Sequence, residues 1–333
     1  ANNTLVDQYE YTYLNLSSKF EVLNSLLVAG SLRQMMQDGE VLLERFTPKG
    51  KNLVVYRPEK QRKKKKQAEI IYIGADDKIE KRFNLLDPGV VSGSLNFVHN
   101  ESGNYLAGLY CNADKDSYAG FFIYRFDANL ENPELVISSP FSQDEKKNKM
   151  QVGNMIDLIP DPQTGMLYVY LRELSLHISR NKNGEENSRY YREGNIAVHA
   201  VSPAGKVNYS YYIEKADQIV ESERDYATSA MVYDGKFYLV STSKADKVKN
   251  LPPVVNVEKG NSEINECPIV FAFGEKGPES ATRIENLDLN KNYTSYVNRS
   301  TATQGFIIMS DYENTQHVFG DSQLANYILY KPH

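Results

Sequence analysis

The sequence predicts an all-β protein of β-propeller-like architecture, with roughly five to six blades of antiparallel strands. Three observations favour this fold class. An apolar strand, a Gly-centred turn and a second apolar strand recur along the chain. Strands do not alternate with long helices, which disfavours an α/β fold. Tyr and Phe, residues that suit strands, number 24 and 13 among 333 residues. The recurring unit occupies Phe46–Tyr56, His99–Gly108, Pro160–Tyr170, Val201–Val207 and Val232–Val240.

In chain order, the first expected elements are a strand at Tyr9–Leu14 and a short helix within Leu23–Met36, where the apolar spacing is compatible with a helix. From Val41 onward the pattern is almost entirely strand. About twenty strands in four-stranded blades would give about five blades, and a pair of β-sandwiches is the alternative architecture. The clearest strands are Leu53–Tyr56, Ile70–Ile73, Tyr105–Tyr110, Phe121–Tyr124, Leu167–Tyr170, Ile196–His199, Phe237–Val240, Ile269–Phe273, Phe306–Met309 and Tyr327–Tyr330.

The polar segments fall between these strands and predict loops. Lys60–Gln67 is interpreted as a charged hairpin tip, with a polyanion patch or a nuclear signal as the alternative. Asn181–Ser188 is a second polar excursion, and Ser243–Asn265 is the longest candidate loop. Because no linker divides the chain, we expect residues 1–333 to form a single domain, with residues 1–39 as an N-terminal extension that contains the short helix.

The composition of the chain bears on which partners it binds and on the state of its cysteines. The 38 Lys and Arg against 43 Asp and Glu give a net charge of −5, which argues against a nucleic-acid partner. No run approaches the roughly 20 apolar residues of a membrane helix. Cys111 and Cys267 are expected to be two buried reduced thiols, with a single bridge between them as the alternative.

Signals for chemistry are weak, and the sequence predicts no catalytic, cofactor-binding or metal-binding residue. The segment Asn112–Tyr118 has oxygen ligands at alternate positions like a calcium loop, but Ser117 and Ile123 stand where such a loop needs Gly and Glu. No Gly-rich phosphate loop and no nucleophile elbow occur. A Ser-His-Asp triad assembled in space stays open. The histidines, which lack metal-ligand spacing, are His99, His177, His199, His317 and His333.

The segment from Tyr190 to Lys215 and the hairpin Tyr233–Leu239 carry a resemblance to a known family. They resemble a repeat-like segment of uncharacterised Bacteroidetes β-propeller-like proteins, which reads G-(N/D)-I-x-V-x-x-(I/V)-S/D-P-x-G-K. The match covers about a tenth of the chain, and it departs from the family pattern at Tyr209, where Trp is frequent, and at Ala216. The resemblance implies no activity, but it implies an extracytoplasmic protein of the periplasm or the outer membrane.

The function expected from these features is a non-enzymatic binding or scaffold protein of the bacterial cell envelope. It would engage a protein or a glycan through loops on one face, and the regions of interest are the loops around Lys63 and Pro252 and the tyrosines of residues 190–212. The alternative is a glycan-active hydrolase or lyase with its site at the propeller channel. A third reading is one subunit of a large envelope assembly.

Overall fold

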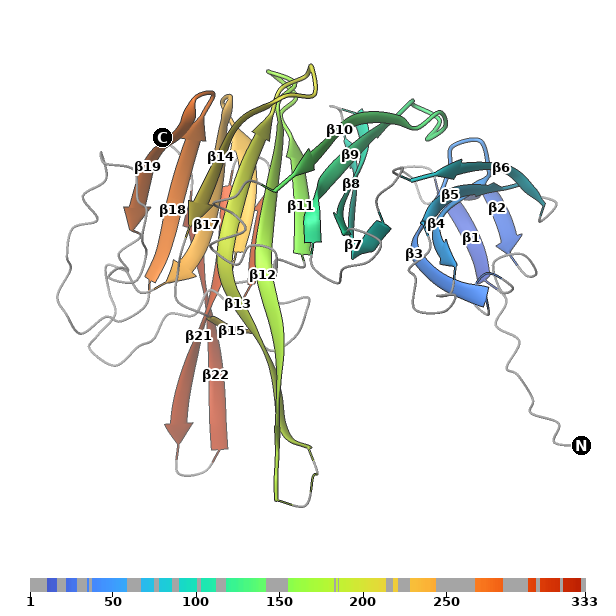
Figure 1. Cartoon of the computed structure of the whole chain (residues 1–333). Coiled ribbons are helices and arrows are strands. Elements are labelled where there is room, and N and C mark those ends of the chain that lie inside the picture. The colour runs from blue at the N-terminus through green and yellow to red at the C-terminus, as the bar shows by residue number, and fades with distance from the viewer. Residues whose placement is uncertain are drawn as a thin grey trace, which may run out of the picture. The chain divides into compact units, whose positions relative to one another are not determined.

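The chain is almost entirely β-strand in the computed structural model (Figure 1). It divides into two compact units, unit 1 spanning Ala1–Phe141 and unit 2 spanning Ser142–His333, and each is described by itself. The structure describes residues 11–16, 22–28, 35, 38–58, 67–74, 78–85, 90–100, 103–111, 118–141, 155–182, 184, 186–213, 218–220, 228–243, 267–283, 299–303, 306–317 and 320–330.

Unit 1 contains a two-stranded sheet and two four-stranded antiparallel sheets, and in each four-stranded sheet the strands neighbour one another in chain order. The first strand of one sheet, β3, contacts the first strand of the next, β7, as the inner strands of propeller blades do. The strands are β1 (Tyr11–Leu16) with β2 (Val22–Val28); β3 (Gly39–Phe46), β4 (Asn52–Pro58), β5 (Glu69–Ile73) and β6 (Ile79–Asn84); and β7 (Val90–Asn100), β8 (Gly103–Cys111), β9 (Tyr118–Phe126) and β10 (Glu134–Pro140).

The core of unit 1 follows from the period-2 alternation of its strands. One face of β3–β6 packs on one face of β7–β10 through residues such as Val55, Tyr72 and Phe122. The intervening residues of β4 and β5, among them Val54 and Ile71, are equally buried on the opposite face. These strands therefore read as nearly continuous apolar runs, because both of their faces are covered.

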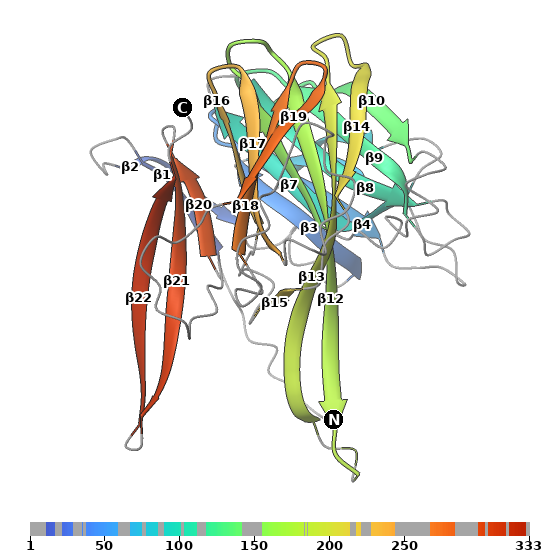
Figure 2. The same ribbon diagram turned by 90° about the vertical axis from the view of Figure 1, so that its left-hand side faces the viewer.

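Unit 2 repeats the pattern in three sheets (Figures 1 and 2). The first strand of the middle sheet, β16, contacts the first strands of the sheets on either side, β11 and β20. The strands are β11 (Met155–Pro160), β12 (Leu167–Arg180), β13 (Glu186–Val201) and β14 (Val207–Ile213), with β15 (Gln218–Val220) on the distal part of β13; β16 (Thr228–Tyr233), β17 (Lys236–Ser243), β18 (Cys267–Gly274) and β19 (Gly277–Arg283); and β20 (Arg299–Thr303), β21 (Phe306–His317) and β22 (Gly320–Tyr330).

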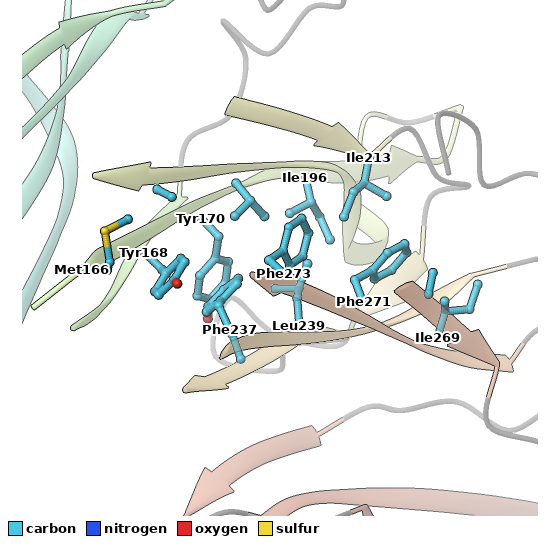
Figure 3. Packing of buried hydrophobic residues seen from close by; sticks show 14 residues of the cluster. Met166, Tyr168, Tyr170, Ile196, Ile213, Phe237, Leu239, Ile269, Phe271 and Phe273 are labelled. Carbon is cyan, nitrogen blue, oxygen red and sulfur yellow. The ribbon is translucent and has the colours of Figure 1, made fainter. Parts of the chain in front are cut away.

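The core of unit 2 lies between the sheet β11–β14 and the sheet β16–β19, whose side chains point toward one another in Figure 3. Phe237 is fully buried at its centre. Its ring stacks on Tyr168 at 4.8 Å between centroids, and it also contacts Tyr170 and Phe273. Aromatic residues thus supply much of the area that joins these two sheets.

The predicted Gly-centred turns close the hairpins by one recurring device. The first turn residue, Thr47 or Ser202, accepts a hydrogen bond at its carbonyl from a glycine three positions later, and its hydroxyl accepts one from the next amide. That glycine, Gly50 or Gly205, has a φ of +77° or +74°, a left-handed conformation that costs glycine little. The turns therefore predict the hairpins for a physical reason.

The fold-class prediction is confirmed: the protein is all-β and propeller-like, built from successive antiparallel meanders. The expected helix within Leu23–Met36 is wrong over Leu23–Val28, which belongs to β2, because this segment pairs with β1 instead of forming a helix. Helical backbone is described at Met35 and Asp38. The single domain of residues 1–333 stays a prediction.

Several segments singled out by the sequence lie outside the described residues, namely 59–66, 112–117 and 244–266, so the loops around Lys63 and Pro252 and the calcium-like loop receive no structural account. Because β4 pairs with β5, the charged run does connect the two strands of a hairpin. Cys111 is a buried thiol in β8. In the part of the chain that the structure describes, no helix is long and apolar enough to cross a membrane.

Candidate functional site

The strands β12 and β13 run past the rest of their sheet as a two-stranded projection, which is clear in both Figure 1 and Figure 2. We call residues 174–180 of β12 and 186–193 of β13 the β-arm. Its register pairs His177 with Tyr190 and Ser175 with Arg192. Directly opposed residues of an antiparallel pair share a face, and so do residues two apart on one strand. All four side chains therefore project from one face of the β-arm.

These four side chains contact one another. The imidazole of His177 stacks on the ring of Tyr190, with centroids 5.5 Å apart and an interplanar angle of 9°. The guanidinium carbon of Arg192 lies 5.5 Å from the centre of the same ring, and its Nη2 donates to the Tyr190 hydroxyl at 3.3 Å. Ser175 Oγ is hydrogen-bonded to His177 Nε2 at 3.1 Å.

The four residues are half-buried, so they are held in place while solvent still reaches them. They bring together an imidazole, a phenol and a guanidinium, which can respectively accept a proton, donate a proton and pair with an anion. We call Ser175, His177, Tyr190 and Arg192 the arm cluster.

A buried ionic network fixes the base of the β-arm. Arg172 is 1% exposed and donates to Asp157 Oδ2 at 2.7 Å and to Glu193 Oε2 at 3.0 Å. Glu193 also accepts a hydrogen bond from the hydroxyl of Thr228, which is itself hydrogen-bonded to Ser241 at 2.9 Å. Because Asp157, Arg172 and Glu193 come from β11, β12 and β13, and Thr228 and Ser241 from β16 and β17, the network ties two sheets together at the point where the β-arm begins.

The network holds its charges firmly. Burial on its own would lower the pKa of Arg172, but the negative charges of Asp157 and Glu193 outweigh it and raise that pKa above its ordinary value. The guanidinium is therefore always protonated, and the two carboxylates form their ion pairs with it. Their role is to position the β-arm.

The β-strand geometry links this network to the arm cluster. Arg192 and Glu193 are consecutive in β13, so one side chain faces the cluster and the other faces the buried network. The short strand β15 pairs with β13 at the same place, matching Arg192 with Ile219 and Glu193 with Gln218. The backbone that carries Arg192 is thus hydrogen-bonded on both sides, by β12 and by β15.

The structure places the other candidate residues from the sequence outside the arm cluster. His99 is exposed and hydrogen-bonded to Asn104 in unit 1, far along the chain from the arm cluster. His199 is buried and hydrogen-bonded to Ser210 Oγ at 2.8 Å, so it is a structural residue. Of the tyrosines in residues 190–212, Tyr190 belongs to the arm cluster, whereas Tyr209 and Tyr211 pack against Phe273.

The arm cluster is not predicted from the sequence, where His177 is only one of five histidines that lack metal-ligand spacing. The available signal was the repeated spacing Ser175-x-His177 and Tyr190-x-Arg192 on either side of a polar turn. Within the described ranges, no group of three or more His, Cys, Asp and Glu could hold a metal ion.

Comparisons with known proteins give structural matches only. No family model matches the chain. No curated protein matches it either. Among solved structures, the chain is similar to the polysaccharide lyase Uly1, with 8% identity and a TM-score of 0.41 over 86% of this chain and 57% of that one. It is similar to an exo-β-1,3-galactanase from Phanerochaete chrysosporium, with 8% identity and a TM-score of 0.30 over 96% of this chain and 64% of that one.

A third match is Drosophila Plexin A in complex with Semaphorin 1b, with 10% identity and a TM-score of 0.34 over 97% of this chain and 74% of that one. The chain thus spans less than two thirds of the length of the first two structures. At these scores the likeness is one of β architecture and does not give the reaction of this chain.

These findings correct the expectation of a non-enzymatic binding or scaffold protein. The matched structures are mostly glycan-active hydrolases and lyases. The binding reading also predicts that titratable side chains do not converge, whereas His177, Tyr190 and Arg192 meet on one solvent-accessible face. The alternative reading, a glycan-active enzyme, is taken up below as a proposal.

Proposed function

We propose that this protein is a glycan-active enzyme of the lyase class, which cleaves a uronate-containing polysaccharide at the arm cluster by β-elimination. The observation that supports the proposal is the meeting of His177, Tyr190 and Arg192 on one accessible face. Elimination from a uronate needs an anion-binding group, a base and an acid at one place, and these three side chains supply that set.

Arg192 is the residue that would bind the substrate. Its guanidinium pairs with the uronate carboxylate, a planar anion that matches its fork of donors. Neutralising this carboxylate makes the hydrogen on the adjacent C5 more acidic, because negative charge that develops at C5 is drawn into the carboxyl group. The rigid backbone of β13 holds the guanidinium for this purpose.

Two proton transfers complete the reaction. His177 takes the C5 proton on Nδ1, while its Nε2 stays hydrogen-bonded to Ser175. The electron pair of the C5–H bond forms the C4–C5 double bond, and the C4–O4 bond breaks. Tyr190 donates its hydroxyl proton to the leaving O4. The products are an unsaturated uronate at one new chain end and an ordinary sugar hydroxyl at the other.

The structure favours elimination over hydrolysis for a chemical reason. Most glycoside hydrolases use two carboxyl groups that flank the scissile bond. The described carboxyl groups nearest the arm cluster are already engaged: Asp157 and Glu193 bind Arg172, and Glu173 accepts a hydrogen bond from Asn195 at 3.0 Å. Glu186 lies farther out, paired with Arg180 at the far end of the β-arm. Glu193 is fully buried, so it cannot reach a substrate without disrupting the network.

The test is a screen of polygalacturonate, alginate and hyaluronan, with neutral xylan as the comparison. The readout is the ultraviolet absorbance of the C4–C5 double bond. We expect turnover of at least one uronate polymer and a loss of about 100-fold or more in Tyr190→Phe and His177→Ala. Ser179→Ala, two positions beyond His177 on the same face, is the matched control and should retain the activity.

Two results would contradict the lyase proposal. One is the absence of any absorbance change on all the uronate polymers. If new reducing ends appear without an absorbance change, the protein cleaves the polymer by hydrolysis and not by elimination. The other is unchanged activity in Tyr190→Phe and His177→Ala. Location in the bacterial cell envelope and membership of a Bacteroidetes family remain proposals that rest on the sequence resemblance alone.

A further inference from the structure

A second feature of unit 2 lies at the other end of the sheet that carries the β-arm. The β11–β12 turn and the β16–β17 turn enclose a solvent-open hollow of about 460 Å³. From Leu167, beside this hollow, to Ser175 in the arm cluster, β12 covers eight residue steps, or about 26 Å. The hollow is therefore separate from the arm cluster. Its lining residues are Asp161, Pro162, Gln163, Val232, Tyr233 and Asp234.

The β11–β12 turn forms one wall and is fixed from within. Asp161 is fully buried, and its carboxylate accepts hydrogen bonds from the Gln163 amide at 2.9 Å and from the Thr164 hydroxyl. Its backbone carbonyl accepts a hydrogen bond from Gly165 at 2.9 Å. The charge of Asp161 is thus used inside the turn, where it holds the backbone of Gln163 in place.

The β16–β17 turn forms the other wall. Asp234 and Gly235 have φ values of +48° and +69°, the paired left-handed conformations of a tight two-residue hairpin turn. This turn reverses the chain direction between Tyr233 and Lys236, which pair across the hairpin. The side chain of Tyr233 is half-buried, and Asp234 is exposed. Both walls are therefore formed before any ligand arrives, which lowers the entropic cost of binding.

The lining has the chemistry of a sugar site. The ring of Tyr233 and the apolar side chains of Pro162 and Val232 offer contact area for the C–H face of a pyranose. The amide of Gln163 and the carboxylate of Asp234, both exposed, can bond to ring hydroxyls. No Lys or Arg is among the lining residues, and Asp234 repels anions.

We propose that this hollow is a binding site for a neutral sugar residue, distinct from the uronate site on the β-arm. A volume of this size lies within the usual range of small-molecule sites. The proposal depends on the lining alone, so it stands whether or not the β-arm catalyses elimination. If the lyase proposal and this one are both correct, the two ends of one sheet bind a polysaccharide that contains both neutral and acidic sugars.

The test is calorimetric titration of the full chain with cellotriose, xylotriose and galactotriose, with trigalacturonate and chitosan trimer as charged counterparts. We expect one of the neutral trisaccharides to bind. Gln163→Ala should weaken that binding by about threefold to tenfold, the range expected for one lost hydrogen bond. Asp234→Asn keeps a residue that tolerates positive φ, so it should weaken binding while the turn persists.

Lys206→Ala, in the neighbouring β13–β14 turn, is the matched control and should leave binding unchanged. Thermal unfolding of each variant shows whether the fold is intact. Two outcomes would overturn the proposal: no neutral trisaccharide binds, or binding is the same in Gln163→Ala and Asp234→Asn as in the parent protein. Binding of the chitosan trimer alone would also overturn it, since that would indicate a cation site.

Discussion

Replacing Glu193 by Gln is the sharpest test of how unit 2 is held together. Glu193 is fully buried and bonds to both Arg172 and Thr228. The amide is nearly isosteric with the carboxylate, so packing is kept while the charge is lost. Arg172 then stays buried with only Asp157 to balance it, and the side chain of Asp157 is 24% exposed.

The size of the stability loss in Glu193→Gln follows from the burial of the Arg172–Glu193 ion pair. Removing one partner of a buried ion pair typically destabilises a protein by about 3–5 kcal/mol, because the remaining charge is left poorly compensated in a medium of low polarity. Since Asp157 still pairs with Arg172, we expect the lower end, about 3 kcal/mol. For a unit of this size that corresponds to a fall of about 6–12 °C in the melting temperature.

Chemical denaturation with urea, read at constant m-value, measures this loss. The matched control is Glu279→Gln, the same chemical change in a pair with Lys236 whose side chains are both 47% exposed. That variant should lose far less stability, since exposed ion pairs contribute little. Equal effects of Glu193→Gln and Glu279→Gln would refute the view that the buried network ties the two sheets together.

Two further predictions concern the cores. Phe237→Ala should destabilise unit 2 by about 3–5 kcal/mol, since Phe237 is fully buried and stacked on Tyr168; an unfolding midpoint close to that of the parent protein would contradict this. In unit 1, hydrogen bonds from Lys51 and Lys49 lower the pKa of Glu131 from 4.5 to about 2. A lowered pKa in the folded state means that this contribution is present above pH 4.5 and is lost as the pH falls toward 2. Glu131→Gln should therefore reduce stability more at neutral pH than at pH 2, and a pH-independent effect on urea midpoints would count against it.

The sequence could predict the central strands of the sheets because they bury both faces. Continuous apolar runs such as Ile70–Ile73 and Ile269–Phe273 are buried and would be unfavourable in an exposed loop. The turns between such runs need a left-handed backbone, which glycine adopts at little cost. The same reasoning went wrong at Val22–Val28, where short apolar spacing fits either a helix or a strand and only the pairing with β1 decides.

The β-arm could not be predicted by the same logic. Its strands are stabilised by cross-strand pairs and by β15, not by burial, so residues 174–193 look like a polar excursion between the strands at Leu167–Tyr170 and Ile196–His199. His177 and Tyr190 are thirteen positions apart, and only the register of the hairpin brings them together. Leu176 and Ile178, which are 44% and 39% exposed, show how little burial contributes here.

The register of the β-arm is the property on which its chemistry depends, and a two-stranded hairpin with little burial specifies register weakly. A slip of one residue in β13 would turn Tyr190 and Arg192 together away from His177 and Ser175 on β12. The same slip would carry Glu193 out of the interior and leave the buried Arg172 without one of its two counter-charges. Because that loss is expensive, the buried network penalises the wrong register at the position next to the arm cluster. The polar face of the β-arm thus takes its precision from charges that no substrate touches.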